Sequence, residues 1–381
     1  MPPVMATGGA TRPTVRSLVL ARLRTASQAL GIAGRALTWP PYSHVFLVPD
    51  APTWVLAEEM HELRGVARRL GVPVAAERRP VFVAQQSVFH ASHFALLQQR
   101  TFEGRHRLGV AYFHGRPSPE QPEFHACFEV LRRQHDRLER IQVSHSQMGD
   151  VVLSSGIEPR KVHQIPIGIN LNYFPLQSPA SRAAARRALG VPDSGVVVGS
   201  FQKDGVGWGE GREPKLVKGP DILLQVLDAL RRHVPELFVL LSGPARGYVK
   251  AGLERLGVPY RHVFVADYTH MGELYQALDA YIVTSREEGG PKAVLESMAS
   301  GVPLISTRVG QAMDLVQHEA NGWLVDVGDV AGLTCWARHA LEYRASLGPV
   351  LARARETAQA NTYTAQLPLW REFFRGFVEA A

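Results

Sequence analysis

The sequence predicts an α/β protein with two doubly wound domains, each built on a mostly parallel sheet. From residue 44 onward, short apolar runs rich in β-branched and aromatic residues alternate with stretches of helical period. The apolar runs are nearly continuous, which is typical of parallel strands that helices cover on both faces. These two observations together favour two such domains in a chain of 381 residues.

In the first half, the predicted strands lie at 44–48, 81–84, 108–113 and 141–144, and helical period extends over 53–71 and 123–140. In the second half, the predicted strands lie at 195–199, 237–243, 262–266, 280–285, 302–307 and 322–326. Helical stretches such as 219–233 separate them. A Pro/Ser/Gly-punctuated link with a short helix, residues 175–195, joins the halves, so we expect domains at 41–178 and 179–360 after a basic extension, 1–40.

Composition indicates a soluble globular protein, with 45% hydrophobic and 20% charged residues. No apolar run approaches the roughly 18 residues that a membrane-spanning helix needs. Cys127 and Cys335 lie too far apart in the chain to suggest a disulfide framework or a metal site, so we expect a reducing, cytoplasmic location. The formal charge of +7 suits an anionic ligand or an acidic membrane surface, and is weak support for nucleic acid.

The first 49 residues hold five arginines and no carboxylate. Residues 14–37 place apolar side chains along one helical stripe with arginines beside it, which favours a helix lying on an anionic membrane surface. A helix packed on its own domain, a flexible arginine-rich start and an organellar transit peptide are the alternatives.

The stretch "SREEGGPKAVLESMASG", residues 285–301, follows a predicted strand and enters a predicted helix. Pro291 suits the first turn and Gly301 the end of this helix. The amides around Gly289 and Gly290, together with the helix dipole, would make an anion site.

Two glutamates of this stretch are spaced along the predicted helix. Glu288 precedes the helix, and Glu296 lies about 7–8 Å along its axis from Pro291, at a rise of about 1.5 Å per residue. This order fits a hydroxylated group, a diphosphate and a second hydroxylated group, which is the layout of a nucleotide sugar. The alternative for Glu296 is an exposed pair with Lys292 worth about 0.2–0.5 kcal/mol, and Glu287 is expected to be a solvated or structural loop residue.

A second glycine-rich loop follows the strand that ends at Gly199, and it carries Lys203, Lys215 and Lys218. A lysine there would stabilise the charge that builds on a departing diphosphate. Solvated lysines are the alternative. The loop lacks the Walker pattern, and neither half opens with the G-x-G-x-x-G fingerprint of dehydrogenases.

His114, in "VAYFHGRPSP", follows a predicted strand and would point into a cleft between the domains. The same argument is weaker for His145 in "VSHSQMGD".

These segments, in this order, resemble the retaining glycosyltransferases of family 4, which have the GT-B fold. The resemblance covers residues 108 to 375 and is strongest in "EGGPKAVLESMASGVPLISTRVGQAMDLVQHEANGWLV", where Glu288, seven residues and Glu296 match the paired-glutamate motif. It continues in "LYQALDAYIVTSRE", "LLSGPARG", "VKGPDILL" and "VSHSQMGDVVLSSGIEPRKVHQIPIGINLNYF".

The resemblance implies transfer of a sugar from a nucleotide-diphosphate sugar to a sugar, lipid-linked or other hydroxyl acceptor, with retention and without a metal or other cofactor. Residues 361–381 would hold a final helix that crosses back to the first domain. The implied catalytic residues are His114, Glu288 and Lys218. The implied donor-binding residues are Gly199, Ser200, Lys203, Gly243, Tyr268, Thr269, His270, Gly289, Gly290, Pro291, Lys292 and Glu296.

Three departures from the family pattern leave other functions open. Ser200 stands where the family usually has arginine, a charge that Lys203 would replace. Pro166–Asn170 differs from the usual Pro-Asn-Gly-Ile-Asp, and "PDAPTWVLAEE" replaces the glycine-rich loop after the first strand. The alternatives are a nucleotide-sugar epimerase of the same fold and a pseudoenzyme that binds nucleotide sugar without turnover.

Overall fold

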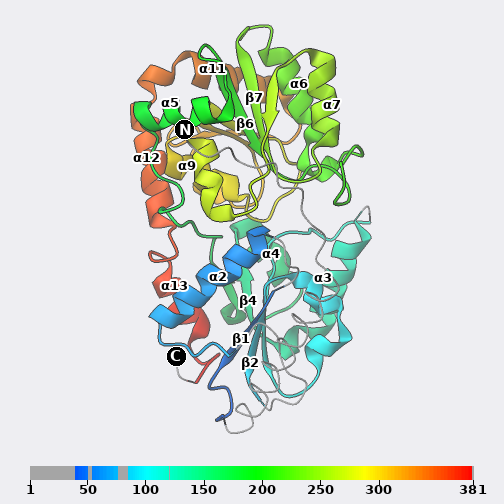
Figure 1. Cartoon of the computed structure of the whole chain (residues 1–381). Coiled ribbons are helices and arrows are strands. Elements are labelled where there is room, and N and C mark those ends of the chain that lie inside the picture. Colours follow the sequence, from blue (N-terminus) through cyan, green and yellow to red (C-terminus); the bar gives the residue numbers. More distant parts are fainter. Residues whose placement is uncertain (1–38, 50–53, 76–84, 120, 380–381) are drawn as a thin grey trace, which may run out of the picture.

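The computed structural model describes residues 39–49, 54–75, 85–119 and 121–379. They form two α/β domains, one above the other in Figure 1, each with a sheet whose paired strands are all parallel. The predicted fold class is therefore confirmed. The basic segment 14–37 and the predicted strand 81–84 lie outside the described residues.

The N-terminal sheet has the order β1-β2-β3-β4-β5. Its strands are β1 (Val45–Val48), β2 (Ser87–His90), β3 (Arg107–Ala111), β4 (Leu138–Val143) and β5 (Val162–Gln164). Helices α2 (Trp54–Arg69) and α13 (Leu367–Phe374) cover one face, and α3 (Pro122–Gln134) and α4 (Ser146–Leu153) cover the other.

The C-terminal sheet has the order β11-β10-β9-β6-β7-β8. Its strands are β6 (Val196–Phe201), β7 (Leu237–Ser242), β8 (Tyr260–His262), β9 (Ala280–Val283), β10 (Leu304–Thr307) and β11 (Trp323–Val325). The chain starts in the middle of the sheet, at β6, and reverses direction at β9. Ligands of such sheets bind outside the carboxyl ends of the strands at this reversal.

Two apolar layers sandwich the C-terminal sheet, because successive strand residues point to opposite faces. Val197 of β6 belongs to one layer and Val198 to the other. The first layer is supplied by α5 (Pro179–Leu189), α8 (Met271–Tyr275), α9 (Lys292–Ser300) and α12 (Gly348–Ala360). The second is supplied by α6 (Pro220–Leu230), α7 (Gly247–Leu256) and α11 (Val330–Glu342), while the short α10 (Ala312–Leu315) follows β10.

The strand predictions differ from the structure in four places. Strands β2 and β5 were missed, since their sequences, SVFH and VHQ, hold only two and one apolar residues. The helix expected over 123–140 ends at Gln134, and residues 138–140 instead begin β4. The strand expected at 262–266 is the edge strand Tyr260–His262, which pairs with β7 on one side.

In the part of the chain that the structure describes, the backbone passes from one domain to the other twice. The second crossing brings α13 onto the N-terminal sheet, where Trp370, Phe373 and Phe374 are buried against residues of β1 and α2. Beside it, the backbone amide of Ile169 donates to the carbonyl of Asn361 at 3.2 Å. Within the described ranges, no helix combines the length and apolarity that crossing a membrane requires.

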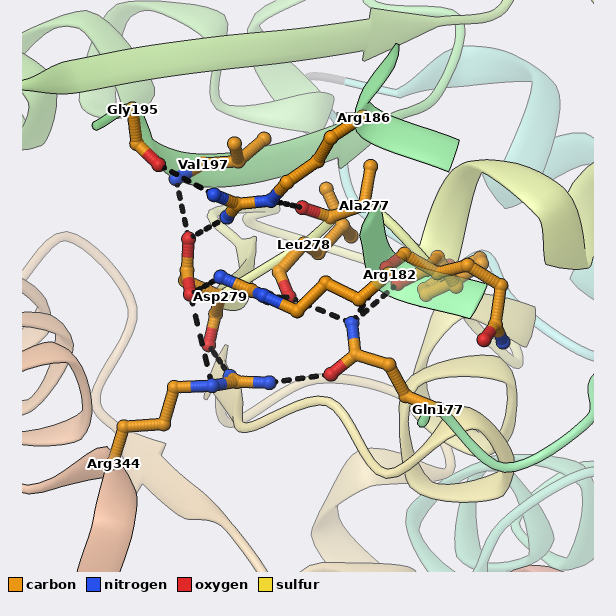
Figure 2. Close-up of polar contacts among 11 residues, drawn as sticks. Gln177, Arg182, Arg186, Gly195, Val197, Ala277, Leu278, Asp279 and Arg344 are labelled. Atoms are coloured by element: carbon orange, nitrogen blue, oxygen red, sulfur yellow. Dashed lines mark hydrogen bonds and ion pairs between the residues drawn. The ribbon is translucent and has the colours of Figure 1, made fainter. Parts of the chain in front are cut away.

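The first crossing ends in α5, which an ion cluster ties to the C-terminal domain. Figure 2 shows the carboxylate of Asp279 facing the guanidinium groups of Arg182, Arg186 and Arg344. The same arginines donate to the backbone carbonyls of residues 195 and 277–279. The Asp279 carboxylate, directly before β9, is thereby tied to α5 and to the turn after α11.

We expect Asp279→Asn to lower the free energy of unfolding by about 3 kcal/mol, because breaking a buried ion pair leaves uncompensated charge. Urea denaturation measures this. The matched control is Asp326→Asn, whose carboxylate is 82% exposed beside Arg308 and is expected to cost under about 1 kcal/mol. Equal losses in the two variants would contradict a structural role for the cluster.

Candidate active site between the two domains

A cavity of about 300 Å³ opens at the carboxyl ends of β6 and β9, where the strand order reverses. Its walls combine aromatic and aliphatic side chains with four lysines and two glutamates. The lining residues are Phe201, Gln202, Lys203, Trp208, Lys215, Lys218, Pro244, Tyr268, Met271, Tyr281, Val283, Glu288, Gly290, Pro291, Lys292, Ala293 and Glu296. Four lysines against two glutamates leave a surplus of two positive charges, which suits an anionic ligand.

Lys218 and Glu288 form an ion pair inside this cavity. Lys218 Nζ lies 2.6 Å from Glu288 Oε2, and Ser285 Oγ donates to Glu288 Oε1 at 2.8 Å. Gly219 follows Lys218 at a φ of +63°, and an added Cβ would lie 1.9 Å from the carbonyl oxygen of Thr284. The close approach of the two loops therefore requires glycine here, and it brings the lysine to the glutamate.

Two more lysines extend the positive wall. Lys203 Nζ donates to the carbonyl of Gly205 at 3.1 Å and lies 5.1 Å from the centre of the Trp208 ring. Burial, and then the charges of Lys218 and Lys203, lower the pKa of Lys215. These ammonium groups repel one another, and a bound anion would relieve that repulsion.

Glu296 is buried at 4% exposure, so the predicted alternative of an exposed pair with Lys292 is wrong. Its two oxygens accept from Tyr268 Oη at 2.5 Å and Tyr275 Oη at 2.8 Å. Burial raises the pKa of Glu296, while the tyrosine hydrogen bonds and Lys292 oppose that rise. Each carboxylate oxygen has two lone pairs, so the group can still accept from a ligand in the cavity.

Lys292 instead points between the domains. Its Nζ lies 3.4 Å from both Glu59 Oε2 of α2 and Tyr363 Oη, and 4.7 Å from the centre of the Tyr268 ring. The same Glu59 oxygen accepts from Tyr363 Oη at 2.6 Å. One lysine of the cavity wall therefore also contacts the N-terminal domain.

His114 follows β3 and packs against aromatic rings, with ring centres 5.1 Å from His93 and 5.3 Å from Phe124. Burial, followed by the charges of Lys218, Lys215 and His145, lowers its pKa to about 3. The imidazole is therefore neutral at physiological pH. It stands beside the lysine wall and is not among the residues that line the cavity.

Ser200, which stands where the family usually has an arginine, does not line the cavity. Ser200 is 1% exposed, and its Oγ accepts from Arg246 Nη2 at 3.1 Å. Arg246 also donates to the carbonyls of Ser200 and Ser242, and its Nε lies 3.0 Å from Asp204 Oδ1. Both members of this ion pair are fully buried, and no periodicity in the sequence indicated either of them.

The structure gathers only part of the predicted site around the cavity. Lys203, Lys218, Tyr268, Glu288, Gly290, Pro291, Lys292 and Glu296 line it. Thr269 and His270 bond locally instead, Thr269 to Asp267 and His270 to Glu273. Gly199 and Gly243 leave room for other protein groups, since an added Cβ would lie 2.5 Å from Leu278 and 2.6 Å from the carbonyl of Gln202.

Gly289 and Gly290 permit contact between the domains. An added Cβ at Gly289 would lie 2.7 Å from Phe113 Cβ, and one at Gly290 would lie 2.6 Å from Ile167 Cδ1. The carbonyl of Gly289 also accepts from Ser144 Oγ at 2.8 Å.

The boundaries of α9 agree with the sequence to within one residue. Pro291 lies directly before the first residue of the helix and not in its first turn, where it was expected. Gly301 ends the helix at a φ of 70°, as predicted.

Residues 213–347 match the family model described as glycosyl transferases group 1. A D-inositol 3-phosphate glycosyltransferase of Salinispora arenicola is 31% identical over 229 residues, 55% of this chain and 47% of the relative. The lipopolysaccharide core biosynthesis mannosyltransferase LpsB of Rhizobium meliloti is 29% identical over 204 residues, 51% of this chain and 54% of the relative. The chain spans about half the length of these curated relatives.

Two solved structures share the fold. Anabaena Alr3699/HepE in complex with UDP-glucose has a TM-score of 0.68 and 19% identity, covering 87% of this chain and 99% of that one. Sucrose-phosphate synthase (tll1590) from Thermosynechococcus elongatus has a TM-score of 0.64 and 18% identity, covering 84% and 77%. These two neighbours show that the fold is GT-B.

The pKa values of His93 and His114 predict a stability that depends on pH. Burial is the first cause of both shifts, each from the ordinary value of 6.5 to about 3. Between these values the unfolded chain binds more protons than the folded chain, so stability falls as the pH falls from about 6.5 toward 3. Urea denaturation at several pH values should show a shallower fall in His114→Gln than in the wild type. Identical pH profiles would contradict a neutral His114 in the folded protein.

Proposed function

We propose that the chain transfers a sugar from a nucleotide-diphosphate sugar to an acceptor hydroxyl with retention of anomeric configuration. The observation that carries this proposal is the Lys218–Glu288 pair, placed in a positively charged cavity where the strand order reverses. Such a cavity offers cations for a diphosphate beside a carboxylate that can accept from sugar hydroxyls.

The diphosphate would lie against Lys203, Lys215 and Lys218. Negative charge grows on it as the bond to the sugar breaks, so the lysines stabilise the transition state more than the bound substrate. Burial already lowers the pKa of Lys215, and an adjacent phosphate would favour its charged form.

Glu288 would orient the sugar, and Glu296 would accept from the ribose hydroxyls beside Tyr268. Both oxygens of Glu288 already accept hydrogen bonds, one from Lys218 and one from Ser285. Because these bonds occupy both oxygens, Glu288 would be a weak nucleophile. This supports a reaction in which the diphosphate leaves and the acceptor hydroxyl attacks on the same face of the sugar. His114 would contact the transferring sugar as a neutral imidazole.

The lysines supply the positive charge that a metal could otherwise provide, so we expect no metal requirement. Among the residues of the described ranges, no three of His, Cys, Asp and Glu gather in a way that could hold a metal ion. The neighbour Alr3699/HepE was solved with UDP-glucose, which makes this donor the first probe to use.

The acceptor would be a sugar, a lipid-linked group or another hydroxyl compound. A lipid-linked acceptor would explain the basic segment 14–37, and it would place the protein at the cytoplasmic face of an anionic membrane. Liposome flotation of the full chain against a chain lacking residues 1–40 tests this, since equal flotation would remove the support.

We expect Lys218→Ala and Glu288→Gln each to lower turnover of UDP-glucose by about 10²–10³-fold, the usual cost of removing one preorganised electrostatic contact. The assay runs in EDTA, and ¹H NMR of freshly released glucose should show the α anomer first. Lys250→Ala and Glu236→Gln lie outside the cavity lining and serve as matched controls with wild-type rates. Wild-type rates in both cavity variants, or release of the β anomer, would contradict the proposal.

A further inference from the structure

The loop after β9 directs successive side chains to different partners. Arg286 forms two hydrogen bonds to the carboxylate of Asp221, at 2.8 and 2.7 Å. The backbone amides of Arg286 and Glu287 both donate to the carbonyl of Val217, at 2.8 and 3.3 Å. Glu288 meets Lys218. The loop is therefore fixed to the lysine loop on both sides of Glu287.

From this fixed base, Glu287 reaches across to the N-terminal domain. Its Oε1 accepts from the backbone amide of Gly115 at 2.8 Å and from that of Arg116 at 3.1 Å. Gly115 has a φ of +99°, and an added Cβ would lie 2.6 Å from Phe124 Cδ1. The turn thus has a conformation that favours glycine, and Glu287 accepts hydrogen bonds from two backbone amides of this turn.

We propose that Glu287 is a positioning residue, which holds the turn carrying His114 against the loop carrying Glu288. This role rests on the proposed function, in which His114 and Glu288 contact the same sugar. The adjacent glutamates would then divide two tasks, with Glu288 facing the donor and Glu287 setting the distance between the two halves of the site.

The chemistry of the contact suits this role. An ionised carboxylate that accepts backbone amides forms shorter and stronger hydrogen bonds than a neutral acceptor does. Glu287 directly precedes Glu288, which pairs with Lys218, so a displacement of the turn would be transmitted directly to the cavity. A displacement of about 1 Å in a reacting group can lower a rate by about 10²-fold.

Asp314 of α10 provides a matched control for contact between the domains in general. Its carboxylate accepts from Ser146 N at 2.7 Å, Ser146 Oγ at 2.6 Å and Gln164 Nε2 at 2.8 Å. It therefore joins the same two domains through α4 and β5, without contacting the amides of Gly115 and Arg116.

The experiment compares Glu287→Ala, Glu287→Gln and Asp314→Ala in the full chain. Hydrogen–deuterium exchange of peptides spanning 113–117 and 144–148 reads the two contacts separately. Turnover of UDP-glucose then gives kcat and KM. We expect Glu287→Ala to accelerate exchange at 113–117 alone and to lower kcat by about 10²-fold with KM changed only a few-fold. Glu287→Gln keeps an acceptor oxygen and should restore most of kcat.

Unchanged exchange at 113–117 in Glu287→Ala would overturn the proposal. An equal fall of kcat in Asp314→Ala would also overturn it, because domain contact in general would then explain the effect. If the wild type turns over no nucleotide sugar, the proposed function fails, and the exchange arm alone then supports or overturns the positioning of the turn.

Discussion

The ion pair between Lys218 and Glu288 is the interaction on which the rest of the site depends. It joins the loops after β6 and β9, the two strands between which the C-terminal sheet reverses its order. Gly219 lets the loops approach within contact distance, and Arg286 fixes the second loop to Asp221 at the start of α6. The cavity, its lysines and the contact with the N-terminal domain all follow from this junction.

Four contacts between the domains pair an acceptor of the C-terminal domain with an amide or hydroxyl of the N-terminal domain, and Lys292 donates in the opposite sense to Glu59. Glu287, Asp314 and Gln311 accept from backbone amides of the N-terminal domain, and the carbonyl of Gly289 accepts from Ser144. Three of these four acceptors are side chains that lie after β9 or β10, at the same edge of the sheet as the cavity. A ligand that changes the loop after β9 would therefore also change the contact between the domains.

The sequence allowed the fold class and the loops of the site to be predicted, because apolar runs and glycines are local signals. It placed Lys218 and Glu288 at strand ends, but their contact depends on β6 lying beside β9, which periodicity does not reveal. Strands β2 and β5 hold only two and one apolar residues, too few to form a recognisable apolar run. Arg246 and Asp204 were missed because burial of a charged pair depends on long-range packing. Glu287 was expected to be only a solvated or structural loop residue, because the direction of its side chain depends on the other domain.

The most direct test of the central claim is a thermal-shift panel of nucleotide-diphosphate sugars on the wild type and on Lys218→Ala. A donor present at 100 times its dissociation constant should stabilise the wild type by about 2.7 kcal/mol. We predict that at least one donor, with UDP-glucose the first to try, produces such a shift and that Lys218→Ala loses most of it. No shift with any nucleotide sugar, or the same shift in both proteins, would contradict the account.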